Sequence, residues 1–161
     1  MAHTFSHLHG INTTGHRFFT VFGERGRPDM APFKFIDRVS RGIEIQQFGD
    51  GSTSRDYTYV GDIVDGVVRS IDRPYKCQIF NLGKGSGTQL SDFIGIVEKH
   101  VGKKAKIEVM PEQPGDVPRT MASTVKARIL LGYRSKITVD EGIKKTVAWY
   151  NQTYGGVEPD K

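Results

Sequence analysis

The amino-acid sequence predicts an α/β fold, on three observations. Segments with apolar residues at helical spacing alternate along the chain with short apolar runs that are typical of strands. Four of the helical segments are followed directly by glycine, which commonly ends a helix. The chain has 161 residues, of which 37% are hydrophobic, and this is enough to bury a core without disulfides.

The predicted elements follow from these patterns in chain order. The predicted helices occupy residues 2–9, 31–41, 62–71, 91–101, 124–131 and 138–150, and the predicted strands occupy residues 14–23, 43–48, 55–60, 78–82 and 105–110. The first helix has no N-cap residue before it, so we expect the chain to begin inside a domain. Residues 49–52, Gly-Asp-Gly-Ser, predict a hairpin between the two strands that flank them. Thr138 and Glu141 predict a capping box, and the tail after Tyr154 is predicted to fray.

Charge and composition exclude several classes of protein. The formal net charge is +5, but the basic residues are scattered and no nucleic-acid-binding signature accompanies them, so we expect no nucleic-acid partner. A small anionic ligand explains the excess equally well. No apolar run approaches the roughly 18 residues of a membrane span, so no membrane partner is expected. The single cysteine, Cys77, predicts a buried thiol in a reducing, cytoplasmic compartment.

Motifs that would carry catalysis are absent from the sequence. There is no Gly-x-Ser-x-Gly elbow, no phosphate loop and no Gly-x-Gly-x-x-Gly after a strand. His3 and His7 lie four residues apart on a predicted helix, but no carboxylate or cysteine follows at zinc-type spacing, so no metal site is expected. We therefore assign no catalytic residue.

Two loops that contain arginine remain as candidate binding sites. Arg25 and Arg27 lie in the first, and Arg55 begins the second as Arg-Asp-Tyr. Arginine suits carboxylate and phosphate because its planar guanidinium donates two parallel hydrogen bonds. Alternation along a strand would place Arg55, Tyr57 and Tyr59 on one face. A surface salt bridge is the alternative explanation for these arginines.

Six segments, taken in order, give the most specific signal. They are residues 17–23, 26–30, 55–63, 79–83, 113–118 and 132–133, read as RFFTVFG, GRPDM, RDYTYVGDI, IFNLG, QPGDVP and GY. Their order resembles the extended short-chain dehydrogenase/reductase family of NAD-dependent nucleotide-sugar epimerases and dehydratases, over residues 1–155. GRPDM together with PGDVP is most similar to the UDP-glucuronate 4-epimerases.

The resemblance implies a particular fold and chemistry. The chain would be the C-terminal, substrate-binding part of an extended Rossmann-like epimerase, residues 1–161, with pieces of the Rossmann sheet in 1–30 and 55–83. In the family, NAD takes a hydride from C4 of the sugar and returns it to the other face of the 4-keto intermediate. The family's glycine-rich turn and Tyr-x-x-x-Lys pair are absent here. We therefore expect this chain alone to bind no NAD and to be inactive.

The same resemblance implies a site for UDP-glucuronate or UDP-galacturonate. The implied substrate-binding residues are Thr20, Arg27, Gln46, Phe48, Arg55 and Asp116. Arg27 matches the arginine that faces the sugar carboxylate. Phe48 and Gln46 match the pair that holds uracil, and an aromatic ring suits a flat base. Arg55 matches the arginine that contacts the diphosphate in the family. Asp116 matches a carboxylate that lies near the ribose hydroxyls.

Three further residues match the position where the nicotinamide end of NAD packs in the family: Phe18, Phe19 and Val21. Packing in a hydrophobic core is an equally good explanation for them. Two departures from the family pattern stand out. His16 occupies a position that is usually leucine, and Gln113 replaces an arginine that contacts the diphosphate in some relatives.

Strands at residues 15–22 and 78–82 are expected to leave edges and apolar faces uncovered. This predicts either a homo-oligomer or a separate N-terminal half as partner. Two other functions stay open at this point: a stand-alone nucleotide-sugar-binding or regulatory module, and a protein-interaction subunit.

Overall fold

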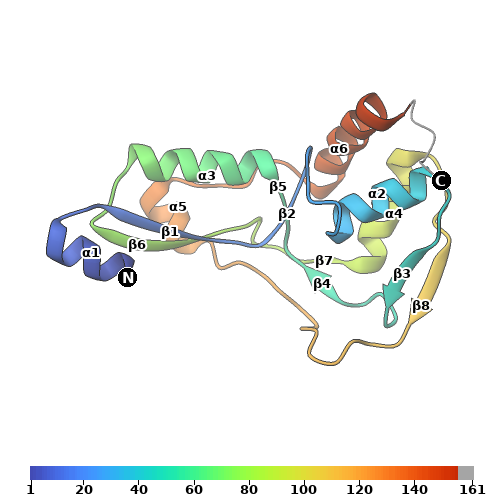
Figure 1. Ribbon diagram of the computed structural model, residues 1–161, viewed down its shortest axis with the longest axis horizontal. Helices are drawn as coiled ribbons and strands as arrows, with labels where there is room; N and C mark the ends of the chain where they lie inside the picture. The colour runs from blue at the N-terminus through green and yellow to red at the C-terminus, as the bar shows by residue number, and fades with distance from the viewer. Residues whose placement is uncertain (156–161) are drawn as a thin grey trace.

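Four short two-stranded sheets organise the chain in the computed structural model, which describes residues 1–155 (Figure 1). Three of the pairs are parallel: β1 (Thr13–Phe18) with β6 (Cys77–Leu82), β2 (Thr20–Phe22) with β5 (Tyr57–Tyr59), and β3 (Ile45–Phe48) with β8 (Ile107–Met110). The fourth pair, β4 (Ser54–Arg55) with β7 (Thr88–Gln89), is antiparallel. Parallel strands alternating with helices confirm the predicted α/β class.

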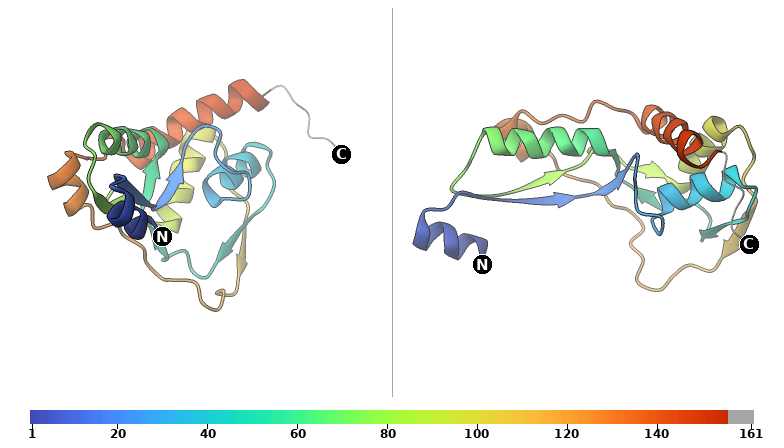
Figure 2. Two further views of the ribbon diagram at one scale, coloured as in Figure 1. Left: turned by 60° about the vertical axis from the view of Figure 1, so that its left-hand side comes forward. Right: turned by 45° about the horizontal axis from the view of Figure 1, so that its top comes forward.

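Six helices complete the described part of the chain: α1 (Ala2–His9), α2 (Ala31–Ser40), α3 (Val60–Asp72), α4 (Leu90–Val101), α5 (Val125–Leu131) and α6 (Val139–Tyr154). They divide the molecule into two lobes (Figures 1 and 2). We call α1, β1, β6, α3 and α5 the sheet lobe. We call α2, α4 and α6, with β2, β3, β5 and β8, the helical lobe. None of these helices is long and apolar enough to cross a membrane.

The helical lobe has a closed aromatic core. Phe93 on α4 lies at its centre and is fully buried. Its ring stacks on Tyr57 at 4.1 Å between centroids and meets Phe22 edge-on at 6.4 Å. Side chains from α6, such as Ile143, complete this core. The core of this lobe is therefore enclosed by side chains of α2, α4 and α6, while β8 stays largely exposed.

The sheet lobe has a smaller core and leaves more apolar surface exposed. Phe80, Leu82 and Leu131 are fully buried between β6 and α5. The exposed large apolar side chains of this lobe include Phe5, Leu8, Phe18, Val64, Val68, Ile71 and Ile79. Three of them, Val64, Val68 and Ile71, lie on α3 at helical spacing and are 54%, 48% and 70% exposed. We call these three the α3 stripe.

Helix ends agree well with the sequence. Gly10 and Gly102 take the left-handed conformation expected of a glycine that ends a helix. Both bonds of the predicted capping box form between Thr138 and Glu141 at the start of α6. The predicted fraying after Tyr154 concerns mainly residues 156–161, which lie outside the described residues.

Two strand predictions were wrong. The strands flanking residues 49–52 do not form a hairpin with each other. Instead β3 pairs with β8, β4 pairs with β7, and β5 pairs with β2. The predicted strand 14–23 is interrupted at Phe19, since β1 and β2 pair with different partners on opposite lobes. The turn at Gly49 and Gly51 does exist, with positive φ at both glycines, but it redirects the chain to a new neighbour instead of folding it back.

Cys77 is only half-buried at the start of β6, so the predicted burial of its thiol was incomplete. His16 is half-buried and its Nε2 lies 2.9 Å from the Ser70 hydroxyl on α3. Because the Ser70 hydroxyl donates to the Val67 carbonyl, His16 Nε2–H is the donor to Ser70. Burial lowers the pKa of His16 from its ordinary value of 6.5.

Candidate binding site

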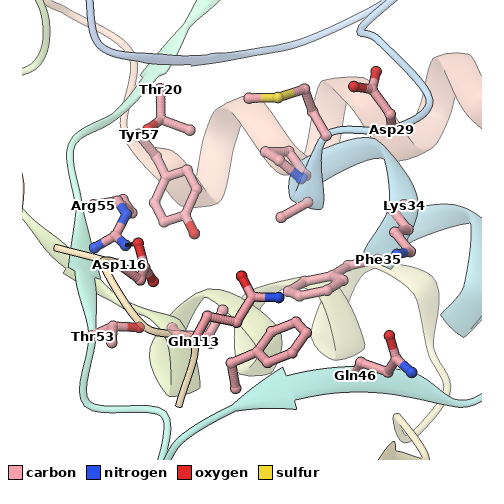
Figure 3. A pocket seen from close by; sticks show the side chains of 15 residues that line it. Thr20, Asp29, Lys34, Phe35, Gln46, Thr53, Arg55, Tyr57, Gln113 and Asp116 are labelled. Atoms are coloured by element: carbon pink, nitrogen blue, oxygen red, sulfur yellow. Dashed lines mark hydrogen bonds and ion pairs between the residues drawn. The ribbon is translucent and has the colours of Figure 1, made fainter. Parts of the chain in front are cut away.

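A hollow of about 510 Å³ opens in the helical lobe, between α2 and the strands β2 to β5 (Figure 3). It is lined by Thr20, Asp29, Met30, Ala31, Pro32, Lys34, Phe35, Gln46, Phe48, Thr53, Arg55, Tyr57, Leu90, Gln113 and Asp116. Its size lies in the range of roughly 300–1,000 Å³ that is usual for small-molecule sites. Aromatic rings line it together with a few convergent polar groups, which is the composition typical of a ligand pocket.

An ion pair forms one wall of this hollow. The Arg55 guanidinium bonds the Asp116 carboxylate at 2.6 Å and also donates to the Ser54 carbonyl at 3.0 Å. Asp116 comes from the proline-rich loop after β8, 61 residues away along the chain. The Arg55 side chain is 21% exposed and faces the hollow (Figure 3). This placement suits a group that binds an anion.

Asp56 fixes the strand segment that carries Arg55 and Tyr57. Its carboxylate is fully buried and accepts N–H bonds from Lys84, Gly85 and Ala122, each at 2.9 Å. The Thr58 hydroxyl also donates to it, at 2.9 Å. Because alternate residues of a strand face opposite ways, anchoring Asp56 behind the strand turns its two neighbours toward the hollow.

The facing wall comes from β3. Gln46 and Phe48 line it, and the Gln46 amide donates to Glu108 on the paired strand β8 at 3.2 Å. The first turn of α2 closes the third side and contributes Lys34. A flat base could lie against the Phe48 ring, which is half-buried.

Arg27 lies outside the lining residues. It forms a two-pronged ion pair with Asp29, in which its Nε lies 3.1 Å from one carboxylate oxygen, and both side chains are mostly exposed. The hydrogen bond from Arg27 is the main cause that lowers the pKa of Asp29. Asp29 does line the hollow, so the pair lies at its rim.

The residues expected near nicotinamide lie where the two lobes meet. Phe18 is about half exposed at the end of β1, and Phe19 occupies the break between β1 and β2. Val21 packs against the core of the sheet lobe. Among residues 1–155, no group of three or more histidine, cysteine, aspartate or glutamate side chains is placed to hold a metal ion.

A sequence profile of the NAD dependent epimerase/dehydratase family matches residues 1–83. The chain belongs to this family. It is 39% identical, over 96% of its length, to 51% of a probable UDP-glucuronate 4-epimerase of Rhizobium meliloti. It is 47% identical, over 93% of its length, to 46% of an uncharacterised protein of Methanocaldococcus jannaschii.

The structure gives a matching result. It superposes on the UDP-glucuronic acid 4-epimerase of Bacillus cereus, solved in complex with UDP-glucuronic acid and NAD, with a TM-score of 0.87 and 30% identity. This match covers 95% of the present chain and 49% of that one. The chain thus spans about half the length of the relatives that it matches.

Of the six predicted substrate residues, the structure brings five to one hollow: Thr20, Gln46, Phe48, Arg55 and Asp116. Arg27 stays at the rim. Sequence reasoning did not assign Tyr57 or Lys34, although the alternation Arg55–Tyr57 was a usable signal for the first. The same alternation placed Tyr59 on the face of Arg55 and Tyr57, and this was wrong. The Tyr59 hydroxyl donates to Glu24, at 2.8 and 2.9 Å from its two carboxylate oxygens, outside the hollow. Burial and Glu24 raise the pKa of Tyr59 to about 12.

Proposed function

We propose that this chain is the UDP-sugar-binding part of a UDP-glucuronate 4-epimerase-like enzyme that interconverts UDP-glucuronate and UDP-galacturonate. The observation that carries the proposal is the convergence of Arg55, Asp116, Gln46 and Phe48 on one hollow, from segments far apart in the sequence. Arg55 suits a phosphate, Asp116 suits the ribose hydroxyls, and Gln46 with Phe48 suits a flat base. The relatives named for this activity support the choice of ligand.

In this proposal the diphosphate lies against Arg55 and the ribose hydroxyls lie near Asp116. The uracil stacks on Phe48 beside the Gln46 amide. Thr20, at the start of β2, contacts the sugar. Arg27 recognises the sugar carboxylate after leaving Asp29, which would distinguish a uronate from a neutral sugar.

The transient oxidation at C4 requires NAD, and we assign the binding of NAD to another polypeptide segment. The sequence has no Gly-x-Gly-x-x-Gly turn after a strand to hold a pyrophosphate and no Tyr-x-x-x-Lys to supply a general base. Phe18 and Phe19 offer only an apolar contact for the nicotinamide end. We therefore expect the chain alone to bind UDP-sugars weakly and to catalyse no epimerisation.

The exposed apolar residues of the sheet lobe favour a protein partner in addition. The α3 stripe and Ile79 would be covered either by an NAD-binding half or by a second copy of this chain. This observation also supports the second candidate function, a protein-interaction subunit that keeps the family fold without using the hollow.

Titration of UDP-glucuronate into the purified chain tests the proposal, with an assay for UDP-galacturonate in the presence of NAD. We expect binding that UDP displaces and no epimerised product. Binding that UDP does not displace would contradict the proposed site, and formation of UDP-galacturonate would contradict the assignment of catalysis to another segment. A chain that associates but binds no UDP would favour the interaction subunit.

A further inference from the structure

The Tyr57 hydroxyl differs from those of four other tyrosines of this chain. The hydroxyls of Tyr59, Tyr75, Tyr133 and Tyr150 each donate to a carboxylate or a backbone carbonyl at 2.7–3.0 Å. Tyr57 as a whole residue is only 3% exposed, and among residues 1–155 its hydroxyl makes no hydrogen bond to another protein group. The oxygen itself is not enclosed, because the fully enclosed unpaired side-chain atoms of the described residues are those of Ser40 and His100. It is therefore an accessible donor in the lining of the hollow.

The ring geometry directs this hydroxyl into the hollow. Tyr57 stacks on the fully buried Phe93 with an interplanar angle of 21°, and its strand is held by pairing with β2 at Thr20. Tyr57 lines the hollow, and its oxygen points into the open space between Gln113 and the first turn of α2 (Figure 3). The hydroxyl is thus held in place before any ligand arrives.

The neighbouring charges indicate which ligand group it meets. Arg55 lies two residues away on the same side of the chain, roughly 7 Å along an extended strand. The guanidinium is already engaged by Asp116 at 2.6 Å, so part of its charge is neutralised. A diphosphate beside Arg55 therefore gains from further donors, and the lining of the hollow also offers the Lys34 ammonium and the Gln113 amide. The Tyr57 hydroxyl is an uncommitted donor in the same wall.

We propose that the Tyr57 hydroxyl donates a hydrogen bond to a phosphoryl oxygen of the nucleoside diphosphate and so acts as a second diphosphate-binding group beside Arg55. The inference rests on the proposed function, since it concerns the same hollow and the same ligand. Burial raises the pKa of Tyr57 to about 12, so the hydroxyl keeps its proton at neutral pH and remains a donor.

Binding of UDP and of uridine to Tyr57→Phe tests the assignment. Phenylalanine keeps the stack on Phe93 and removes only the hydroxyl. We expect UDP to bind about tenfold more weakly or worse, the usual loss for one hydrogen bond to a charged group, while uridine binding is unchanged. Tyr59→Phe is the matched control, because it removes a hydroxyl from the same strand outside the hollow, and it should bind UDP like the wild type.

Unchanged UDP binding by Tyr57→Phe would overturn the inference and leave the proposed function intact. Equal weakening of UDP and uridine would move the contact to the nucleoside and overturn the phosphate assignment. Failure of the wild-type chain to bind UDP would instead contradict the proposed function. Wild-type chain labelled with ¹³C at tyrosine Cζ gives an independent readout: UDP should shift the Tyr57 signal and uridine should not.

Discussion

The two lobes of this chain differ in how completely they bury their own apolar residues. In the helical lobe, α2, α4 and α6 enclose an aromatic core, and the candidate site lies at the edge of that core. In the sheet lobe, α3 and α5 pack on β1 and β6, but the α3 stripe and Ile79 stay in solvent. Under the proposed function, this difference assigns ligand binding and partner binding to separate parts of the molecule. Substitutions in each lobe can test this separation.

Removing the central ring of the helical lobe should have the largest effect. We expect Phe93→Ala to lower the free energy of unfolding by about 3–5 kcal/mol, because a fully buried aromatic side chain is lost. The variant should also lose UDP binding, since Tyr57 loses its stacking partner. Denaturant unfolding and UDP titration measure the two effects. A loss below about 1 kcal/mol would show that the core is not closed as described.

Two buried aspartates give a matched pair for the next test. Asp56 uses both carboxylate oxygens to accept bonds, whereas all three donors to Asp62 reach one oxygen, Oδ2. Asparagine keeps one acceptor oxygen, so in either orientation Asp56→Asn turns an N–H toward two of the four donors, although the Lys84 N–H also has the Thr58 hydroxyl as acceptor. Asp62→Asn can keep its oxygen toward all three donors. We expect Asp56→Asn to cost about 2–4 kcal/mol in unfolding free energy and Asp62→Asn about 1 kcal/mol or less. Equal losses would contradict the anchoring role of Asp56.

The α3 stripe should matter for association and not for folding. We expect Val68→Lys to reduce self-association of the chain, measured by sedimentation at several concentrations, because it places a charge in an apolar surface. Its unfolding free energy should change by no more than about 0.5 kcal/mol. Val109→Lys on β8, a similarly exposed valine of the helical lobe, is the control and should associate like the wild type. Equal effects of the two substitutions would remove the distinction between the lobes.

The smallest effect concerns His16 and pH. The pKa of His16 in the folded chain lies below 6.5. At pH values between the folded pKa and 6.5, the unfolded chain therefore binds more protons at this residue than the folded chain does. The stability associated with neutral His16 is therefore present above pH 6.5 and is lost as the pH falls from there to the folded value. His16→Gln keeps an N–H donor for Ser70 but does not titrate. Its unfolding free energy should fall less across this pH window than that of the wild type; an identical fall would refute the prediction.

Local features were predictable from the sequence because they depend on neighbouring residues. The glycines that end α1 and α4 and the capping box of α6 act within a few positions, and all three formed as expected. Strand pairing was less accessible, because the partner of β3 lies 62 residues further along the chain in β8. The break at Phe19 has the same origin, since it separates strands whose partners belong to different lobes.

In the candidate site, too, some features could be predicted from the sequence and others depend on distant residues. Arg55 lies in one of the six segments whose order resembles a known family, Phe48 was matched to that family by its position, and both line the hollow. The pairing of Arg27 with Asp29 depends on side-chain conformations that no pattern encodes. The separate orientations of Tyr57 and Tyr59 depend on Phe93 and Glu24, which lie 36 and 35 residues away along the chain.

The central claim is that the hollow in the helical lobe binds the diphosphate of a UDP-sugar through Arg55. Calorimetric titration of UDP into the wild-type chain, Arg55→Ala and Arg128→Ala tests it most directly, since Arg128 is an exposed arginine on α5 outside the hollow. We predict wild-type binding with a Kd above about 1 µM, because the proposed function assigns one wall of the cleft to another polypeptide segment. Arg128→Ala should match it and Arg55→Ala should show no measurable binding. Equal binding by all three proteins, or none by the wild type, would contradict the account.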